Sequence, residues 1–439
     1  MAPKYEIVKD PLHGYLRIYR HELKIIDTPV FQRLRRIKQN TGVDFVYPCA
    51  VHTRFSHSLG VMHIAGVFTR WLLDQMENIS EDTKAYYYFL MRLWGLTHDI
   101  GQGPFSHLFD DTVLSTFDTD HEKMGAEILR KSENIPTKLR TEYGRDISLN
   151  KVAKLLEVKS LEDWPLTDTI EGSDVNERIL FYVSHGAYSA DLMDYVMRDS
   201  YFTGAGYGNI DWQRMIYASI PKEDKVCLDA KAEEAFDSLI LARLFMFSAV
   251  YYHRTARAAV RIIKYFLEDA SLSIDFGEFV EDINKYEQLD EDFLLYNPAL
   301  VNSEYRNRLI KREIPYSRVK QIALGIEDVE TSGFLEEDAL TQATRTRLES
   351  NLQQLPPKAF FVDTPKIPTN PLFSEDFIYL YDTERRNPVY SRPVRKTRWG
   401  TLTNEMCIIR LYIHDDYRQH ESAITRAFSH GRRERTTFY

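Results

Sequence analysis

The dipeptide His98-Asp99 ends an apolar run, and its two side chains could bind a metal ion together. An imidazole and a carboxylate suit a divalent ion of intermediate hardness. Neighbouring residues on a helix point about 100° apart, so both could reach an ion just beyond the helix end. The segment Gly101-Gln-Gly-Pro104 would end that helix and let a loop fold back over the ion. Taken alone, the pair could also be a capped helix end.

Two other segments offer similar ligands. His57 opens a stretch whose apolar residues recur at helical spacing. Much further along, Asp191, Asp194 and Tyr195 lie three and four positions apart, and therefore on one face of a second helical stretch. The sequence thus supplies a histidine, a His-Asp pair and a distant aspartate for one site.

This order of ligands resembles the metal-binding pattern of the HD-domain phosphohydrolases. The chain resembles one branch of this family in particular, the dGTPase-like deoxynucleoside triphosphate triphosphohydrolases. The segments that carry this resemblance are residues 9–14, 27–39, 98–110 and 251–254. The resemblance implies that a divalent metal ion (Mn, Mg, Fe, Ni or Zn) is the cofactor. It also implies that the ion polarises the α-phosphate and activates water, and that its ligands are His57, His98, Asp99 and Asp191.

The same resemblance implies a catalytic group of His107, Asp110 and His121. His107 would meet the α-phosphate and protonate the leaving 5′ oxygen, because an alkoxide is a poor leaving group near neutral pH. Asp110 lies three residues after His107 and could orient a histidine, with His121 as its expected partner. The alternative for His121 is a structural role, bracing the loop after Gly103.

By resemblance, further side chains would surround a deoxynucleotide substrate. Arg54, Arg243 and Arg254, with His253, are candidates for binding phosphate, where a guanidinium can hold two oxygens at once. The apolar flanks of Arg243 favour a pocket position over the alternative of a surface arginine. Two further candidates would contact the sugar: the Tyr195 ring would crowd the 2′ position, and Asp199 would accept a hydrogen bond from the 3′-OH. The remaining candidates, which would contact the nucleoside, are Gln39, Tyr251 and Tyr252.

Three positions depart from the family pattern. Gln102 stands where relatives usually have histidine, and glutamine cannot carry a proton or a charge. Leu192 directly follows Asp191, where members that cleave triphosphates tend to place Lys or Arg. Glu6 reverses the charge of a basic residue in the nucleotide-activated site of the vertebrate branch, so we do not expect the same nucleotide switch.

We therefore expect a metal-dependent phosphohydrolase that converts a deoxynucleoside triphosphate (dGTP-type) to deoxynucleoside and inorganic triphosphate. Leu192 and Gln102 keep open an HD phosphohydrolase that acts on nucleoside monophosphates or another small phosphoester. A catalytically weak nucleotide-binding or scaffold protein is a third possibility. A nuclease is disfavoured, because no basic-aromatic stripe is evident.

The elements that must position these residues are predicted to be mainly helical, with an HD-domain core over residues 1–270. A short β-element precedes residue 20, and helices follow over about 21–130 and 181–270. The polar, charged segment 131–180 is interpreted as a surface helical insertion.

Residues 271–439 are predicted to form a smaller α+β lobe that contributes to assembly. Its proline-dense segment 355–371 cannot be a helix interior. Strands are expected at 377–381 and 407–413, and a final helix at 417–430.

Composition sets the remaining bounds. The 439 residues are 44% hydrophobic and can bury a large core, and the net charge of −9 argues against extended nucleic-acid binding. Three widely spaced cysteines, no apolar leader and no membrane-spanning run predict a cytoplasmic protein without a membrane partner. With 27 Tyr and 24 Phe, and by resemblance, we expect a homo-oligomer, a dimer or a tetramer.

Overall fold

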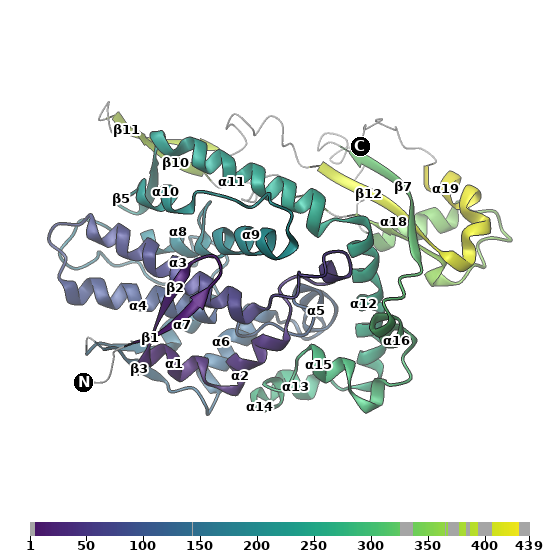
Figure 1. The fold of residues 1–439 in the computed structure, drawn as a ribbon, viewed down its shortest axis with the longest axis horizontal. Coiled ribbons are helices and arrows are strands. Elements are labelled where there is room, and N and C mark those ends of the chain that lie inside the picture. Colours follow the sequence, from purple (N-terminus) through teal and green to yellow (C-terminus); the bar gives the residue numbers. More distant parts are fainter. Residues whose placement is uncertain are drawn as a thin grey trace.

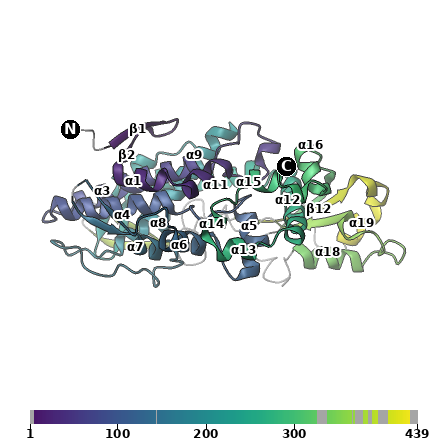
Figure 2. The same ribbon diagram turned by 90° about the horizontal axis from the view of Figure 1, so that it is seen from below.

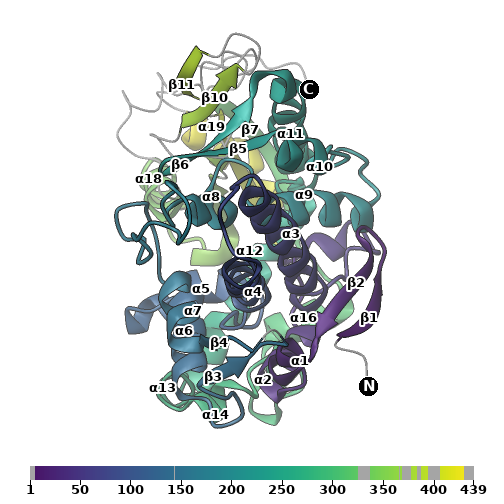
Figure 3. The ribbon, with the colours of Figure 1, turned by 90° about the vertical axis from the view of Figure 1, so that its left-hand side faces the viewer.

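The computed structural model describes residues 5–142, 144–324, 337–364, 366–367, 377–382, 387–393 and 406–429. The chain opens with an antiparallel hairpin of β1 (Tyr5–Asp10) and β2 (Gly14–Tyr19), in which Asp10 pairs with Gly14. Gly14 has a φ of +75°, which a residue without a Cβ adopts readily. Figure 3 shows this hairpin at one edge of the molecule, near α3 (Arg54–Asp74). The predicted N-terminal β-element is confirmed.

Two long helices, α3 and α4 (Glu81–Thr97), pack against each other through the centre of the main body. They approach closely at Gly95, where a Cβ would lie 3.0 Å from the backbone of Met62. A third helix, α9 (Ala190–Thr203), packs on α3 and is capped by Ser189, whose side chain accepts the backbone N–H of Leu192. The predicted metal ligands lie in α3 and α9 and directly after α4.

Further helices surround this centre and make the chain mainly helical, as predicted (Figure 1). The N-cap of α6 is Asp120, whose side chain accepts the backbone N–H of Lys123. The surrounding helices are α1 (Arg20–Ile26), α2 (Pro29–Gln32), α5 (His107–Thr112), α6 (His121–Lys131), α7 (Leu149–Leu156), α8 (Ile179–His185), α10 (Trp212–Tyr217), α11 (Glu233–Met246) and α12 (Arg254–Ser273).

The segment 131–180 is not the surface helical insertion that its polar composition predicted. It contains a hairpin of β3 (Lys138–Arg140) and β4 (Asp146–Ser148), followed by α7. Its widely spaced apolar side chains enter the main core, among them Leu139, Ile147 and Trp164. Strands of three residues are too short to produce a recognisable period, so the polar residues between them dominated the sequence pattern.

Four helices after α12 also belong to the main core, although they follow the predicted boundary at residue 270. They contribute buried Phe276, Tyr286, Leu294 and Leu309. These helices are α13 (Gly277–Glu281), α14 (Ile283–Tyr286), α15 (Glu291–Leu295) and α16 (Glu304–Lys311).

A second core begins beyond α16 and forms an α+β lobe, at one end of the molecule in Figure 2. Its sheet has the antiparallel order β7-β12-β8, with the short β9 also paired to β12. Ile322, Phe360, Leu411 and Phe428 pack between this sheet and the helices. The lobe consists of β7 (Tyr316–Leu324), α18 (Glu337–Thr346), β8 (Phe360–Asp363), β9 (Lys366–Ile367), β12 (Met406–His414) and α19 (Glu421–Ser429).

Two C-terminal strands return to the main body, where Figure 1 shows them near α10 and α11. They are β10 (Phe377–Asp382) and β11 (Asn387–Pro393), in a sheet of order β11-β10-β6-β5. The hairpin of β5 (Ser219–Lys222) and β6 (Lys225–Asp229) interrupts a region that was predicted to be entirely helical. Within the described residues no single helix meets the length and hydropathy of a membrane span, although the bent pair Ala230–Tyr251 and Arg254–Ser273 does so by length and composition alone.

Candidate metal centre

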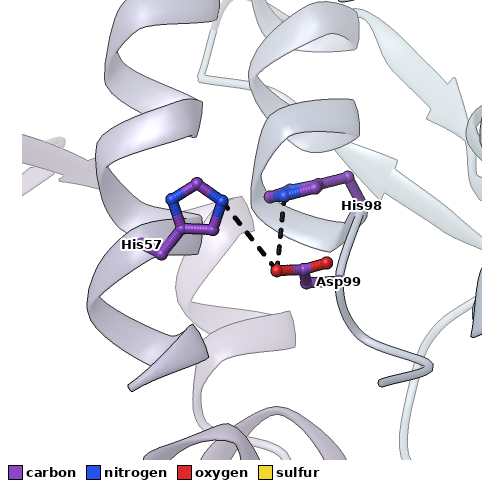
Figure 4. Close-up of side chains that lie close together, drawn as sticks. All are labelled: His57, His98 and Asp99. Carbon is purple, nitrogen blue, oxygen red and sulfur yellow. Dashed lines mark ion pairs between the residues drawn. The ribbon is translucent and has the colours of Figure 1, made fainter. Parts of the chain in front are cut away.

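The structure brings all four predicted metal ligands together. His57 lies in the first turn of α3, His98 and Asp99 directly follow the last residue of α4, and Asp191 lies in the first turn of α9. The Nε2 of His57 is 2.9 Å from Asp191 Oδ1 and 3.9 Å from Asp99 Oδ2. The Nε2 of His98 is 3.5 Å from Asp99 Oδ2 and 3.7 Å from Asp191 Oδ1. Figure 4 shows His57, His98 and Asp99 directed toward one point.

One nitrogen of each histidine faces the proposed ligands: His57 Nε2, which is hydrogen-bonded to Asp191 Oδ1, and His98 Nε2. His57 Nδ1 donates to Asp194 Oδ2 at 2.8 Å, and His98 Nδ1 donates to the Gly95 carbonyl at 2.8 Å. This arrangement directs both Nε2 atoms toward the carboxylates, as is usual for metal-binding histidines. The Nε2 of His98 is buried and has no hydrogen-bond partner. Two imidazole nitrogens and two carboxylates therefore fit a divalent ion.

Burial and charge favour the ionisation states that a metal site needs at His98 and Asp99. Burial would lower the pKa of His57, but hydrogen bonds to Asp191 and Asp194 raise it to about 9, so a metal ion would displace a proton from this ring. Burial lowers the pKa of His98, which keeps its imidazole neutral. Burial would raise the pKa of Asp99, but the Arg54 guanidinium and nearby histidines hold it well below its usual range. Arg54 Nη1 donates to Asp99 Oδ2 at 2.7 Å. Asp99 is therefore ionised although it is almost completely buried.

A second group of His107, Asp110 and His121 lies close enough for His121 to influence the Asp99 carboxyl electrostatically. The predicted pairing of Asp110 with His121 is present as a hydrogen bond of 2.5 Å from His121 Nδ1 to Asp110 Oδ2. His107 Nδ1 is 3.4 Å from the same oxygen, and the His107 side chain is 67% exposed. Asp110 thus lies on the Nδ1 side of both rings.

The loop between the two groups is strained and tightly held. Phe105 and Ser106 have φ angles of +63° and +53°, which side chains other than glycine adopt at a cost of about 1–3 kcal/mol. Ser106 Oγ donates to the Lys38 carbonyl and accepts a hydrogen bond from Arg54 Nε. Gln102 is fully buried, and neither atom of its amide has a hydrogen-bond partner. The loop is therefore tied through Arg54 to Asp99, and it contains an unsatisfied buried amide at Gln102.

Several of the predicted substrate contacts lie close to one another and to Asp191. Asp199, on α9, accepts a hydrogen bond of 2.5 Å from the Tyr251 hydroxyl. Burial raises the pKa of Tyr195 to about 12, with charges on Arg243 and Asp199 nearby and the Tyr252 phenol also close. Arg243 is half-buried, and its Nε has no hydrogen-bond partner.

Arg54, Gln39 and Arg254 lie in different surroundings. Arg54 donates hydrogen bonds to Asp99 and Ser106. Its positive charge therefore compensates the negative charge of a predicted metal ligand even when no phosphate is bound. Gln39 is buried, and its Oε1 has no hydrogen-bond partner. Arg254 does not join this group among the described contacts: it is exposed at the start of α12 and adds to the charge around Arg318 of β7.

Sequence reasoning missed three residues of this network. His52 Nε2 donates to Asp199 Oδ1 at 2.7 Å, and Asp194 accepts hydrogen bonds from both His57 and His13. Asp194 lies three residues after Asp191 and therefore on the same helical face. This spacing is the one feature of the sequence that could have assigned Asp194 to the site. His13 and His52 are isolated histidines whose partners lie far away in the chain, so no spacing links them.

Comparisons with known proteins agree with this geometry. An HD domain model matches residues 54–162, and a model described as HD associated region matches residues 210–378. An uncharacterized protein from Methanocaldococcus jannaschii is 35% identical over 263 residues, which cover 59% of this chain and 48% of that protein. The deoxynucleoside triphosphate triphosphohydrolase SAMHD1 homolog of Dictyostelium discoideum is 26% identical over 398 residues, which cover 86% and 72% of the two chains.

A solved structure shows the same fold along nearly the whole chain. A hypothetical protein from Aquifex aeolicus has a TM-score of 0.72 at 24% identity, covering 96% of this chain and 100% of that one. The chain spans about half of the length of the archaeal relative.

Proposed function

This chain is an HD-domain protein with an HD-associated region, and on that premise we propose that it is a metal-dependent deoxynucleoside triphosphate triphosphohydrolase. The products would be a deoxynucleoside and inorganic triphosphate. The observation that supports this most is the convergence of His57, His98, Asp99 and Asp191 beside a second group built on Asp110. The activity in the name of the Dictyostelium relative supports the choice of substrate.

A divalent ion bound by the four ligands would supply Lewis-acid chemistry, polarising a phosphate oxygen and lowering the pKa of water. The protein's own groups would handle the rest. Asp110 fixes the orientation of His121 and His107, so that His107 can deliver a proton to the leaving 5′ oxygen. Arg243, with an unpartnered Nε, would bind the outer phosphates.

Tyr195 and Asp199 would select the sugar. They lie one helical turn apart on α9, and Asp199 retains lone pairs for a 3′-OH although it already accepts two hydrogen bonds. The neighbouring Tyr195 ring would crowd a 2′-OH, which favours deoxyribose over ribose.

Two departures still favour the rival activity, on a monophosphate or another small phosphoester. Leu192 is buried and packs in the main hydrophobic core, so its side chain brings no charge to the outer phosphates of a nucleotide. Gln102 cannot supply charge to an outer phosphate either.

Product analysis separates the two activities. The purified protein is incubated with Mn²⁺ or Mg²⁺ and a panel of deoxynucleotides, and the products are resolved by ion-exchange chromatography. The proposal predicts inorganic triphosphate from deoxynucleoside triphosphates and no activity in the Asp191→Ala variant. Orthophosphate as the sole inorganic product from every substrate would instead support the phosphomonoesterase.

We further propose that the protein acts in the cytoplasm as a homo-oligomer on free deoxynucleotides. The acidic net charge and the position of the site within the helical body, rather than on a basic face, support nucleotides over polymers.

A further inference from the structure

A carboxylate that the proposed reaction does not use lies directly behind a metal ligand. Asp194 Oδ2 accepts a hydrogen bond from His57 Nδ1 at 2.8 Å, on the side of the ring opposite the metal site. Its other oxygen, Oδ1, accepts one from His13 Nε2 at 2.6 Å. His13 belongs to the turn between β1 and β2, at the N-terminus of the chain. One carboxylate therefore connects the hairpin turn to the ligand histidine.

The hairpin turn is held at this place by more than one contact. Arg198 donates to both oxygens of Asp194, at 2.7 and 2.9 Å, and to Asp10 Oδ2 at 2.9 Å. The other oxygen of Asp10 accepts the backbone N–H groups of Leu12 and His13. Both the backbone and the side chain of His13 are thus fixed relative to Asp194. The side chains of His13, Asp194 and Arg198 are fully buried.

Helix α3 leaves room for this carboxylate. Gly60 lies one turn after His57, and a Cβ at Gly60 would lie 1.9 Å from Asp194 Oδ1 and 2.4 Å from Arg198 Nη2. A glycine inside a helix costs about 1 kcal/mol relative to alanine. Any larger residue would push Asp194 away from α3, and with it the hydrogen bond to His57. The glycine at position 60 of α3 therefore leaves space for the Asp194 carboxylate and the Arg198 guanidinium.

We propose that the turn Asp10–Gly14 is part of the metal centre and that His13 is a positioning residue that acts through Asp194 on His57. The inference rests on the proposed metal site. A carboxylate that orients a ligand histidine fixes its tautomer and increases its basicity, and loss of such a partner lowers metal affinity by about 10- to 100-fold. Because His13 acts one step further away, its loss should fall near the lower end of that range.

The first test measures Mn²⁺ affinity by isothermal titration calorimetry in the full chain. His13→Ala should weaken binding about tenfold, and His13→Gln should recover part of the loss because its amide can still donate to Asp194. The matched control is Tyr15→Ala on the same hairpin, where a side chain 71% exposed should leave affinity unchanged. Circular dichroism in the presence of chelator verifies that each variant is folded.

A folded His13→Ala protein with wild-type Mn²⁺ affinity would overturn the inference. If the wild-type protein binds no Mn²⁺, the proposed metal site fails instead, and the two failures are thereby distinguished.

A second test needs no variant. By reciprocity, a hairpin that supports the metal site is itself stabilised when metal binds. Amide hydrogen exchange of residues 10–14 should slow several-fold on addition of Mn²⁺ to the wild-type protein. The hairpin of β3 and β4 makes no described contact with this network and should be unaffected. Equal exchange at residues 10–14 with and without bound Mn²⁺ would contradict the proposal.

Discussion

Asp110 controls the orientation of two histidines with a single oxygen, Oδ2. That oxygen lies 2.5 Å from His121 Nδ1 and 3.4 Å from His107 Nδ1. Burial would raise the pKa of Asp110, but its hydrogen bonds to the two histidines hold it below the usual range. An ionised carboxylate in this position accepts the Nδ1 protons and, in the proposed reaction, would leave the Nε2 atoms to face the substrate.

Replacing Asp110 by asparagine should therefore abolish most turnover without removing the metal. An amide cannot hold both Nδ1–H groups or stabilise an imidazolium, and loss of general acid-base catalysis costs about 10²–10⁴-fold in kcat. Steady-state kinetics and metal content should be measured on the same preparation. The control is Asp111→Asn, which changes an exposed neighbouring carboxylate. Activity within a few-fold of wild type would assign Asp110 a structural role.

The Nε of Arg243 has no hydrogen-bond partner among the described residues. Arg243→Ala should raise KM for a deoxynucleoside triphosphate by roughly 10- to 100-fold, since a hydrogen bond to a charged group is worth about 1.5–3 kcal/mol. The KM for a deoxynucleoside monophosphate should change far less. Arg254→Ala, at an exposed position, serves as the matched control. Equal effects of Arg243→Ala on both substrates would favour the phosphomonoesterase.

At the scale of elements, the long helices of the site were the most predictable part. Apolar residues at helical spacing identified α3, and Asp191, Asp194 and Tyr195 at helical spacing identified α9. Gly101 to Pro104 marked the loop that follows α4. The short hairpins β3–β4 and β5–β6 were missed because strands of three to five residues give no reliable period. The hydrogen bond from His13 to Asp194 spans 181 positions and depends on how the hairpin packs on α9, which local pattern does not encode.

The packing of α15 onto the segment before Gln39 has a consequence for stability. Glu291, at the start of α15, accepts the backbone N–H of Lys38 at 2.9 Å. Burial raises the pKa of Glu291 to about 7, against the opposing charge of Lys38. In the unfolded chain this carboxyl titrates near its ordinary value. Its contribution to stability is therefore complete below about pH 4.5 and is lost as the pH rises through 7.

Glu291→Gln should remove this pH dependence, because an amide keeps an accepting oxygen without ionising. At pH 8 the variant should be more stable than the wild type by up to about 3 kcal/mol, and near pH 4.5 the two should be similar. Urea unfolding at several pH values gives the two free energies. Asp292→Asn changes the exposed neighbouring residue and should follow the wild type. A Glu291→Gln protein that loses as much stability as the wild type between pH 5 and 8 would contradict this account.

On the scale of the whole molecule, the C-terminal lobe contacts the segment that carries Tyr251 and Tyr252. Arg410 Nη1 donates to the Tyr252 carbonyl, and the Tyr412 hydroxyl donates to the Arg254 carbonyl. Arg257 on α12 pairs with Asp363 of β8 through a buried ion pair. These contacts cross between the two cores, so the lobe contributes to the position of Tyr251 and Tyr252 although it carries none of the metal ligands.

Assembly is a separate prediction for the whole molecule, based on the family resemblance and the high content of Tyr and Phe. We expect at least a dimer at micromolar concentration by multi-angle light scattering. A protein that is fully active and monomeric across that concentration range would rule out a requirement for assembly.

Metal stoichiometry tests the central claim most directly. The purified protein is stripped with chelator, reloaded with Mn²⁺ and analysed by plasma mass spectrometry alongside the folded variants His98→Ala and Asp191→Ala. We predict one ion per wild-type chain, with most of it lost in both variants, because each removes a ligand of the same site. Variants that retain one ion per chain would show that His57, His98, Asp99 and Asp191 are not the metal centre.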